Sequence, residues 1–435
     1  MNTSSRETLQ RITQNCDSNT TILRIGTPYT GVGVDDGEFN SREGTDFSNL
    51  GVAIGKNNHL TGLHIDLDDD DTALDVSNRD FYDGLKRNTS ITSLLLRSFR
   101  GVEREILKAF QENNNLTRIC VSCCSLDNGV CRVITKALRQ CTNLKFIEVY
   151  YCNVNDDQLV RITESVTDHR MLEQFKFGTN RISNVGCEAL VTSLLNDANY
   201  ILQTLDLQGN NIGTTGCEAI TKLLRDPNCN LETIILSNNA IDDVGATAIT
   251  SSLSNNKHLK KLYLTNNPMN EIVQDLFLDL LCDTTSINAT YHSNHTLDMI
   301  KLQNGIGGEE LYGNRPSYNR ITWLLYKLNK GRNKSLVAIK KIIGYHPKID
   351  MSPLYNLDLA DDDKNLKALP YVINWFDRAR EAVEDYDEIK VERRKLASIY
   401  QFVGDMPLLF VPTPRIKLVC KKRKRKGNIH RYTYG

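Results

Sequence analysis

One pattern of eleven residues recurs along most of the chain. It reads L-x-x-L-x-L-x-x-(N/C)-x-L, and clear copies are LQTLDLQGNNI at 202–212, LETIILSNNAI at 231–241 and LKKLYLTNNPM at 259–269. Successive copies start about 28 residues apart. A fixed period of this length indicates a solenoid, because single repeats bury a core only by stacking on their neighbours. The nine copies begin at Leu60, Ile91, Leu116, Leu144, Leu172, Leu202, Leu231, Leu259 and Ile287.

Each repeat has the features of a strand followed by a helix. Apolar and polar residues alternate over the first six positions, which predicts a short strand with one buried face. The second half places apolar residues at helical spacing, as in GCEALVTSLL at 186–195. We therefore expect an α/β solenoid in the form of a horseshoe, with a concave parallel sheet and helices on the convex side.

The ninth position of the pattern holds a small polar side chain. The chain leaves the strand at this point, so its backbone donors and acceptors cannot all reach a neighbouring strand. An asparagine carboxamide supplies both kinds of group, and cysteine fits the same space as a weaker hydrogen bonder. We predict an internal ladder formed by Cys124, Cys152, Asn180, Asn210, Asn239 and Asn267, with His295 as the last rung.

The pattern resembles that of leucine-rich repeat proteins. The period of about 28 residues and the alternation of Asn and Cys resemble the ribonuclease-inhibitor-like (RNI-like) subfamily over residues 60–297. The resemblance implies a protein that binds other proteins across its concave surface and rim. It implies no particular contact residues.

The regions that flank the repeats differ from them in composition. A weaker copy begins near Thr20, and residues 26–46 are rich in glycine and acidic residues, which indicates a loop inserted into a degenerate first repeat. After Leu297 the pattern stops, and helices are expected at 320–330, 335–344 and 369–401. We interpret them as a helical cap on the open end of the array; the alternative is a second binding surface. The expected parts are an N-terminal cap at 1–59, leucine-rich repeats at 60–297, a helical C-terminal cap at 298–414 and a basic tail at 415–435.

Charge is distributed unevenly along the chain. Basic and acidic residues number 53 each, but residues 415–435 hold nine basic residues and no acidic one, which leaves a net charge of −9 on the rest. Consecutive cations extend and attract anions. The tail is a candidate nuclear-import signal that an import receptor would bind, a contact for anionic surfaces, or a basic tail without a role. No groove with interleaved aromatic residues accompanies it, so no sequence-specific nucleic acid is predicted. The run consists of Lys421, Lys422, Arg423, Lys424, Arg425 and Lys426.

Four motifs suggest chemistry, but none is specific. Residues 51–56 (GVAIGK) are one residue too short for a phosphate-binding loop and are better interpreted as the end of a helix. Cys120-x-x-Cys123 lacks the second pair that a structural zinc site requires, and His292-x-x-His295 is explained by the ladder. The acidic run at 66–71 lacks the spacing of a calcium loop. We predict no catalytic residue, no metal and no cofactor.

Side chains between the buried strand positions should project from the concave sheet. Several of them are aromatic, and a buried core cannot explain aromatic residues there. Tyrosine and phenylalanine are enriched in the centres of interfaces, although they also suit strands in general. The candidate partner-binding residues are Phe146, Glu148, Tyr150, Lys176, Asp206, Lys261, Tyr263 and Tyr291.

These features favour an interaction scaffold without enzymatic activity, which binds a partner protein through its concave face. The alternative is a GTPase-activating protein, because Ran GTPase-activating proteins resemble the chain in repeat class. That family carries an acidic tail after its repeats, whereas this tail is basic, and no residue can be assigned to position water or stabilise phosphoryl charge. The N-terminus has no apolar signal segment, and no apolar stretch reaches 18 residues. We therefore expect an intracellular protein without a transmembrane segment, located in the cytoplasm or the nucleus.

Overall fold

The computed structural model describes only part of the chain. The chain divides into two compact units, Met1–Lys341 and Ile342–Gly435, and every described residue belongs to the first. The cationic run 421–426 and the helix expected at 369–401 lie outside the described residues. These comprise 3–14, 22–26, 37–40, 46–67, 74–97, 102–111, 115–166, 169–196, 200–285 and 287–302, with the single residues Ile321, Leu325, Val337, Ala338 and Lys341.

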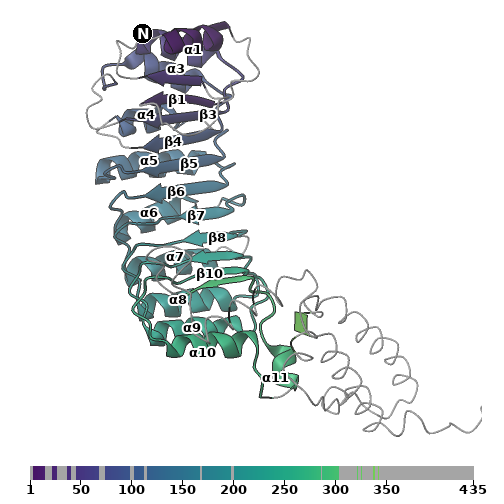
Figure 1. Ribbon diagram of the computed structural model, residues 1–435. Coiled ribbons are helices and arrows are strands. Elements are labelled where there is room, and N and C mark those ends of the chain that lie inside the picture. Colours follow the sequence, from purple (N-terminus) through teal and green to yellow (C-terminus); the bar gives the residue numbers. More distant parts are fainter. Residues whose placement is uncertain are drawn as a thin grey trace, which may run out of the picture. The chain divides into compact units, whose positions relative to one another are not determined.

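The strands of the described part form one open sheet of eleven strands, in which all neighbouring strands are parallel (Figure 1). From β3 to β11 each strand pairs with the strand of the next repeat, whereas β1 lies between β2 and β3. The strands are β1 (Ile22–Gly26), β2 (Gly37–Asn40), β3 (Gly62–Asp66), β4 (Ser93–Arg97), β5 (Arg118–Ser122), β6 (Phe146–Tyr150), β7 (Gln174–Lys176), β8 (Thr204–Asp206), β9 (Thr233–Ile235), β10 (Lys261–Tyr263) and β11 (Met299–Lys301).

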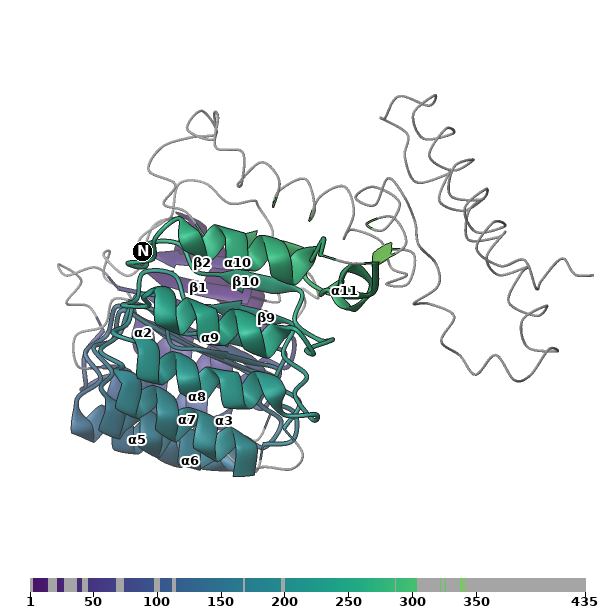
Figure 2. The ribbon, with the colours of Figure 1, turned by 90° about the horizontal axis from the view of Figure 1, so that it is seen from below.

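Helices connect consecutive strands and lie on one side of the sheet. Helices α5 to α10 lie side by side in Figure 2. This arrangement of parallel strands and covering helices confirms the predicted solenoid. The helices are α1 (Thr3–Gln14), α2 (Phe47–Lys56), α3 (Arg79–Arg87), α4 (Glu103–Ala109), α5 (Asn128–Gln140), α6 (Asp156–Val166), α7 (Asn184–Asn196), α8 (Thr214–Arg225), α9 (Asp243–Leu253), α10 (Ile272–Leu281) and α11 (Ile287–His292).

The core lies between the sheet and the helices. Alternate strand residues such as Ile147, Val149 and Leu205 are at most 2% exposed, and they face the buried sides of the helices. The residues between them lie on the opposite face of the sheet, because successive strand side chains point to opposite faces. We call this opposite face the strand face.

The two ends of the array differ from expectation. Strand β2 lies inside residues 26–46, where the composition indicated only a loop. The strand expected at Ile287 is wrong, because α11 starts there and the last described strand, β11, follows Leu297 instead. His295 therefore precedes a strand and is not a rung of the ladder; its Nε2 atom lies 3.0 Å from the Tyr291 carbonyl oxygen.

Asparagine side chains link the repeats where the strands end. Asn210 accepts a hydrogen bond from the Ile182 amide at 3.0 Å and donates to the carbonyls of Phe177 and Leu207 at 2.9 and 3.0 Å. Each carboxamide thus joins its own turn to the preceding repeat. The same pattern recurs at Asn180, Asn239 and Asn267. The thiols of Cys124 and Cys152 contact carbonyls of their own turns, at 3.1 Å in each case.

A second set of asparagines links the repeats on the other side, where the helices end. Asn294 donates to the carbonyls of Leu253 and Asn256 at 2.8 and 3.2 Å and accepts from the Leu297 amide at 3.0 Å. It thereby satisfies a carbonyl at the end of α9, and such carbonyls have no partner within their own helix. Related bonds occur at Asn57, Asn88 and Asn256.

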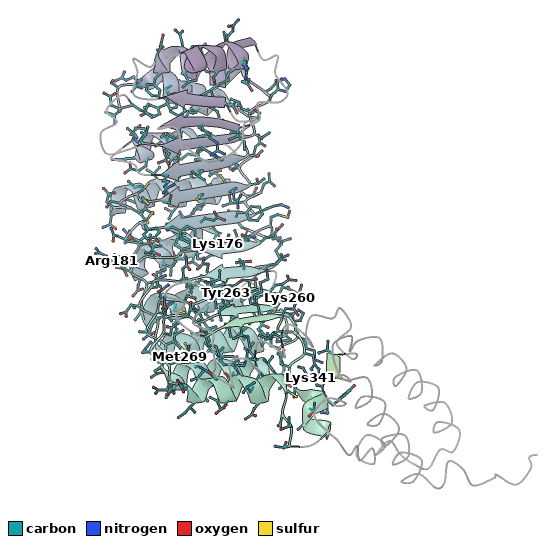
Figure 3. The ribbon with its side chains drawn as sticks, viewed as in Figure 1. Lys176, Arg181, Lys260, Tyr263, Met269 and Lys341 are labelled. Atoms are coloured by element: carbon teal, nitrogen blue, oxygen red, sulfur yellow. The ribbon has the colours of Figure 1, made fainter. Side chains whose placement is uncertain are left out.

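Lys341 ends this second ladder (Figure 3). Its fully buried ammonium donates to the carbonyls of Leu281 and Asn294. Leu281 is the last residue of α10, as Leu253 is of α9, so the ammonium occupies the position that the next asparagine would take. This contact belongs to the expected C-terminal cap, most of which lies outside the described residues. Ile321, Leu325, Val337 and Ala338 are buried as well.

Candidate functional site

The strand face carries side chains in rows that cross the strands. The middle row combines charged side chains over β6 to β8 with an apolar residue, a tyrosine and a lysine over β9 to β11. We therefore distinguish a central part of the face, over β6 to β8, from a C-terminal part, over β9 to β11. By register the middle row runs Cys120, Glu148, Lys176, Asp206, Ile235, Tyr263 and Lys301.

Glu148 is the centre of an ion network on the strand face. Its carboxylate accepts from Lys176 Nζ at 2.9 Å and from Arg118 Nη2 at 3.2 Å, and its side chain is 13% exposed. Burial raises the pKa of Glu148, but the hydrogen bonds and charges of Lys176 and Arg118 outweigh burial, so the net shift is downward. The Arg118 guanidinium also lies over the Phe146 ring, 5.0 Å from its centroid. Both cations therefore have a carboxylate partner within the face itself.

Asp206 is the buried member of the middle row. Only 3% of the residue is exposed, and its carboxylate accepts from Tyr150 Oη at 2.9 Å and from the Gln208 amide at 3.0 Å. Burial raises the pKa of Asp206, and these hydrogen bonds offset part of the shift. The predicted contact residue Asp206 is thus buried, and the Tyr150 side chain reaches across two strands to bind it.

Cys120, in the Cys-x-x-Cys motif, is a buried thiol in the middle row. Cys120 is 8% exposed, and burial together with neighbouring Glu148 raises the pKa of its thiol to about 12. A protonated thiol is a poor nucleophile and metal ligand. Among the described residues, no group of three or more His, Cys, Asp or Glu side chains could hold a metal ion. Asp66 pairs with Arg97 at 3.8 Å, and Asp68 to Asp71 lie outside the described residues.

The C-terminal part of the strand face presents aromatic, apolar and cationic side chains together. Lys261 and Lys301 are exposed, Tyr263 is half-buried, and Met299 is 36% exposed. Lys301 Nζ lies 5.7 Å from the centroid of the Tyr263 ring, and Tyr263 Oη lies 3.1 Å from Met299 Sδ. Figure 3 labels Tyr263 on β10. Sequence reasoning missed Met299 and Lys301, because the start of the last repeat was placed at Ile287, ten residues before Leu297.

Tyr291 does not belong to this surface. It lies in α11, where its ring meets that of His292 edge-on at 5.3 Å, and it is 45% exposed. The error follows from the misplaced strand at Ile287. Asn294 and Leu297 precede β11, and their spacing Asn-x-x-Leu also precedes β10 at Asn256. This signal in the sequence identifies the last strand correctly.

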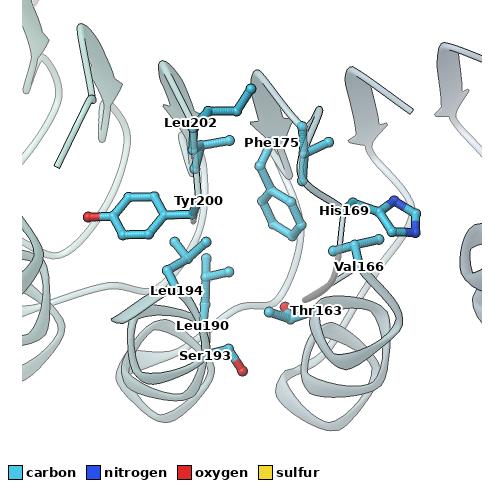
Figure 4. A pocket seen from close by; sticks show the side chains of 11 residues that line it. Thr163, Val166, His169, Phe175, Leu190, Ser193, Leu194, Tyr200 and Leu202 are labelled. Carbon is cyan, nitrogen blue, oxygen red and sulfur yellow. The ribbon is translucent and has the colours of Figure 1, made fainter. Parts of the chain in front are cut away.

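A small cavity lies inside the array, between the repeats of α6 and α7 (Figure 4). Its volume is about 30 Å³, which is room for about two water molecules. Its walls are mostly apolar, so we interpret it as a packing gap between adjacent repeats. Thr163, Val166, His169, Phe175, Leu190 and Tyr200 are among its lining residues.

Two segments of the array match a known family model. Residues 199–220 and 228–249 match a family model described as a leucine-rich repeat. No curated protein sequence matches the chain. Among solved structures, an internalin from Listeria monocytogenes is 14% identical, with 62% of this chain and 91% of that one covered and a TM-score of 0.29. A protein from Bacteroides fragilis is 13% identical, with 54% and 70% covered and a TM-score of 0.33. No helix of the described part is long and apolar enough to span a membrane.

Proposed function

We propose that this leucine-rich repeat protein is a non-catalytic scaffold of the RNI-like type, which binds a partner protein on its strand face. The observation that carries the proposal is the group of Lys261, Tyr263, Met299 and Lys301, presented together on a sheet that hydrogen-bonded ladders hold on both sides. A surface formed before binding loses little entropy when a partner docks. Aromatic residues and methionine are enriched at protein interfaces.

The predicted contact residues divide into two roles. Phe146, Lys261 and Tyr263 remain candidates for direct contact, because they lie on the strand face with part of their surface accessible. Glu148, Lys176, Tyr150 and Asp206 bind one another within the face, so their substitution would disturb the sheet before it disturbed a partner. These four side chains therefore support the contact surface.

No described contact favours the GTPase-activating alternative over a scaffold. The nuclear-import role of residues 421–426 is tested by the location of a fluorescent fusion with and without the run.

The scaffold proposal is tested by obstructing the strand face without removing an existing contact. Thr204 and Thr233 are register partners on β8 and β9 and are half-buried, so tyrosines there would stand over the face. The matched control places tyrosines at Thr192 and Thr247, which are exposed on helices α7 and α9. Partners captured from a lysate of the native cell are compared by mass spectrometry.

A protein retained by the wild-type chain and the control, but lost with Thr204→Tyr and Thr233→Tyr, is the expected result. Equal capture by all three chains would show that the partner binds elsewhere. Circular dichroism and thermal unfolding verify that each variant is folded.

A further inference from the structure

The charged side chains of the strand face are unequally matched. In the centre, Arg118 and Lys176 share the carboxylate of Glu148. In the C-terminal part, neither Lys261 nor Lys301 forms an ion pair with any described residue, and both are exposed. The neighbouring Lys260, by contrast, pairs with Glu232. Within the part of the chain that the structure describes, these two ammonium groups have no carboxylate partner, so their charge is open to a binding partner.

Apolar surface accompanies these two cations. Ile235 and Tyr263 occupy adjacent positions of the middle row, and Met299 is the register partner of Lys261. We call Ile235, Lys261, Tyr263, Met299 and Lys301 the C-terminal patch. A partner that matches it needs negative charge next to an apolar side chain.

We propose that the C-terminal patch binds an extended acidic segment of a protein partner, with two carboxylates beside an apolar residue. The inference rests on the scaffold function proposed above and specifies the chemistry of the partner. Complementary charge on such a surface speeds the encounter and selects the partner, while the buried apolar contact supplies affinity.

The register of the patch supports an extended peptide. Lys261 is opposite Met299 and Tyr263 is opposite Lys301, so the two lysines lie diagonally across one strand pair. From the spacing of strands and residues in a sheet, their Cα atoms are about 8 Å apart. In an extended peptide, side chains on one side recur every two residues, about 7 Å apart. Carboxylates at positions i and i+2 therefore fit the two ammonium groups.

Charge argues against a nucleic acid at the same place. Outside the basic tail the chain carries a net charge of −9, and the patch contributes only two cations. Nucleic-acid binding depends on many phosphate contacts, roughly 6–10 in a typical complex. Two lysines beside a tyrosine and a methionine match a short acidic peptide better than a polyphosphate backbone.

The test uses a displayed library of random twelve-residue peptides, selected on the full chain. Enriched peptides are synthesised with a fluorescent label, and their affinities are measured by polarisation against three chains. These are the wild type, Lys261→Glu with Lys301→Glu, and Lys136→Glu with Lys222→Glu. The last pair lies on helices α5 and α8 and changes the net charge equally. All three chains keep the basic tail, so binding to the tail cancels in the comparison.

We expect enrichment of Asp or Glu pairs two residues apart beside an apolar residue. Lys261→Glu with Lys301→Glu should lower the affinity for these peptides at least about tenfold. Lys136→Glu with Lys222→Glu should change the affinity less than about twofold. Added salt should weaken wild-type binding. Tyr263→Ala should also lower the affinity for the peptides, because it removes the apolar contact.

Four outcomes would overturn the proposal. The first is acidic peptides that bind the patch variant as well as the wild type. The second is an enriched set without acidic residues, or no enriched set. The third is a single-stranded oligonucleotide, used as a competing probe, that binds through the patch lysines while peptides do not. The fourth is a partner whose binding is blocked by Thr204→Tyr with Thr233→Tyr but is unaffected by Lys261→Glu with Lys301→Glu. That result would support the scaffold function and reject an acidic segment as the ligand of the patch.

Discussion

The phenol of Tyr150 donates a hydrogen bond to the carboxylate of Asp206, 2.9 Å away and two strands further along the sheet. The side chain passes over Gly178, where an added Cβ atom would lie 2.6 Å from the tyrosine ring. Three successive repeats thus meet in one contact. Tyr150 belongs to the framework of the strand face, and its truncation to alanine is no neutral probe of partner binding.

Tyr150→Phe should lower the free energy of unfolding by about 1–2 kcal/mol, because it leaves the buried Asp206 carboxyl without one of its donors. The ring and its packing remain. Tyr263→Phe is the matched control and should cost less than about 0.5 kcal/mol, since its hydroxyl touches only a thioether. Urea denaturation of both variants measures the difference. Equal losses of unfolding free energy in the two variants would mean that the Tyr150 hydroxyl stabilises the fold no more than the Tyr263 hydroxyl does.

The contributions of Asp206 and Glu148 to the free energy of unfolding should depend on pH in opposite directions. Burial raises the pKa of Asp206 in the folded chain, so its contribution is full below the unfolded-state pKa and is lost as pH rises through the folded-state pKa. Burial acts upward on the pKa of Glu148 too, but Lys176 and Arg118 lower it overall. The Glu148 contribution is therefore present above its unfolded-state pKa and is lost as pH falls through the folded-state value.

This difference is measured by urea denaturation from about pH 3 to about pH 7. Relative to the wild type, Asp206→Asn should gain stability as pH rises. Glu148→Gln should lose relative stability over the same change. Parallel pH profiles for both variants would contradict the assigned shifts.

Asn210→Ala should lower the free energy of unfolding by about 1–3 kcal/mol, because it leaves the Ile182 amide and the Phe177 carbonyl without their side-chain partner. Asn211→Ala is the control, since that neighbouring side chain is exposed. Thermal unfolding compares the two variants. If both unfold at the wild-type temperature, Asn210 does not link the repeats.

Much of the fold could be predicted from the period and the alternation of residues. Leu60 through Leu259 correctly precede strands β3 to β10. The last repeat was misjudged because Ile287 continues the regular spacing, although α11 is inserted there. Asn294-x-x-Leu297 carried the correct information. Its asparagine performs a physical task, the satisfaction of a helix-end carbonyl, which a count of leucines does not detect.

The sequence predicts which residues lie on the strand face, but it does not predict which of them contact one another. Alternation places Glu148, Tyr150 and Lys176 on the strand face, as the structure does. It cannot reveal that a tyrosine reaches two strands away, because this depends on a glycine at the position between them. Nor can it distinguish a lysine engaged in an ion pair, such as Lys176, from one such as Lys261 that pairs with no acidic residue of the described ranges.

Gly84→Ala should destabilise the N-terminal repeats by about 2–4 kcal/mol, the range of severe overpacking. A Cβ atom at Gly84 would lie 1.9 Å from the Gly51 carbonyl oxygen, so helices α2 and α3 would have to move apart. Gly129→Ala in α5 is the control, because its nearest neighbour is a side-chain oxygen at 3.0 Å. Chemical denaturation measures both. A smaller loss at Gly84 than at Gly129 would contradict the close approach of α2 and α3.

Lys341→Met should loosen the C-terminal end of the array. The substitution keeps most of the aliphatic volume but removes the donor that satisfies the carbonyls of Leu281 and Asn294, at about 1–3 kcal/mol for a buried group left without a partner. Amide hydrogen exchange should accelerate in α10 and β11, while β5 and β6 keep their protection, because repeats far from the lesion open independently. Lys257→Met is the control, an exposed lysine in the same region. Unchanged exchange in α10 would show that the array closes without Lys341, and that its place in the series of asparagines has no energetic consequence.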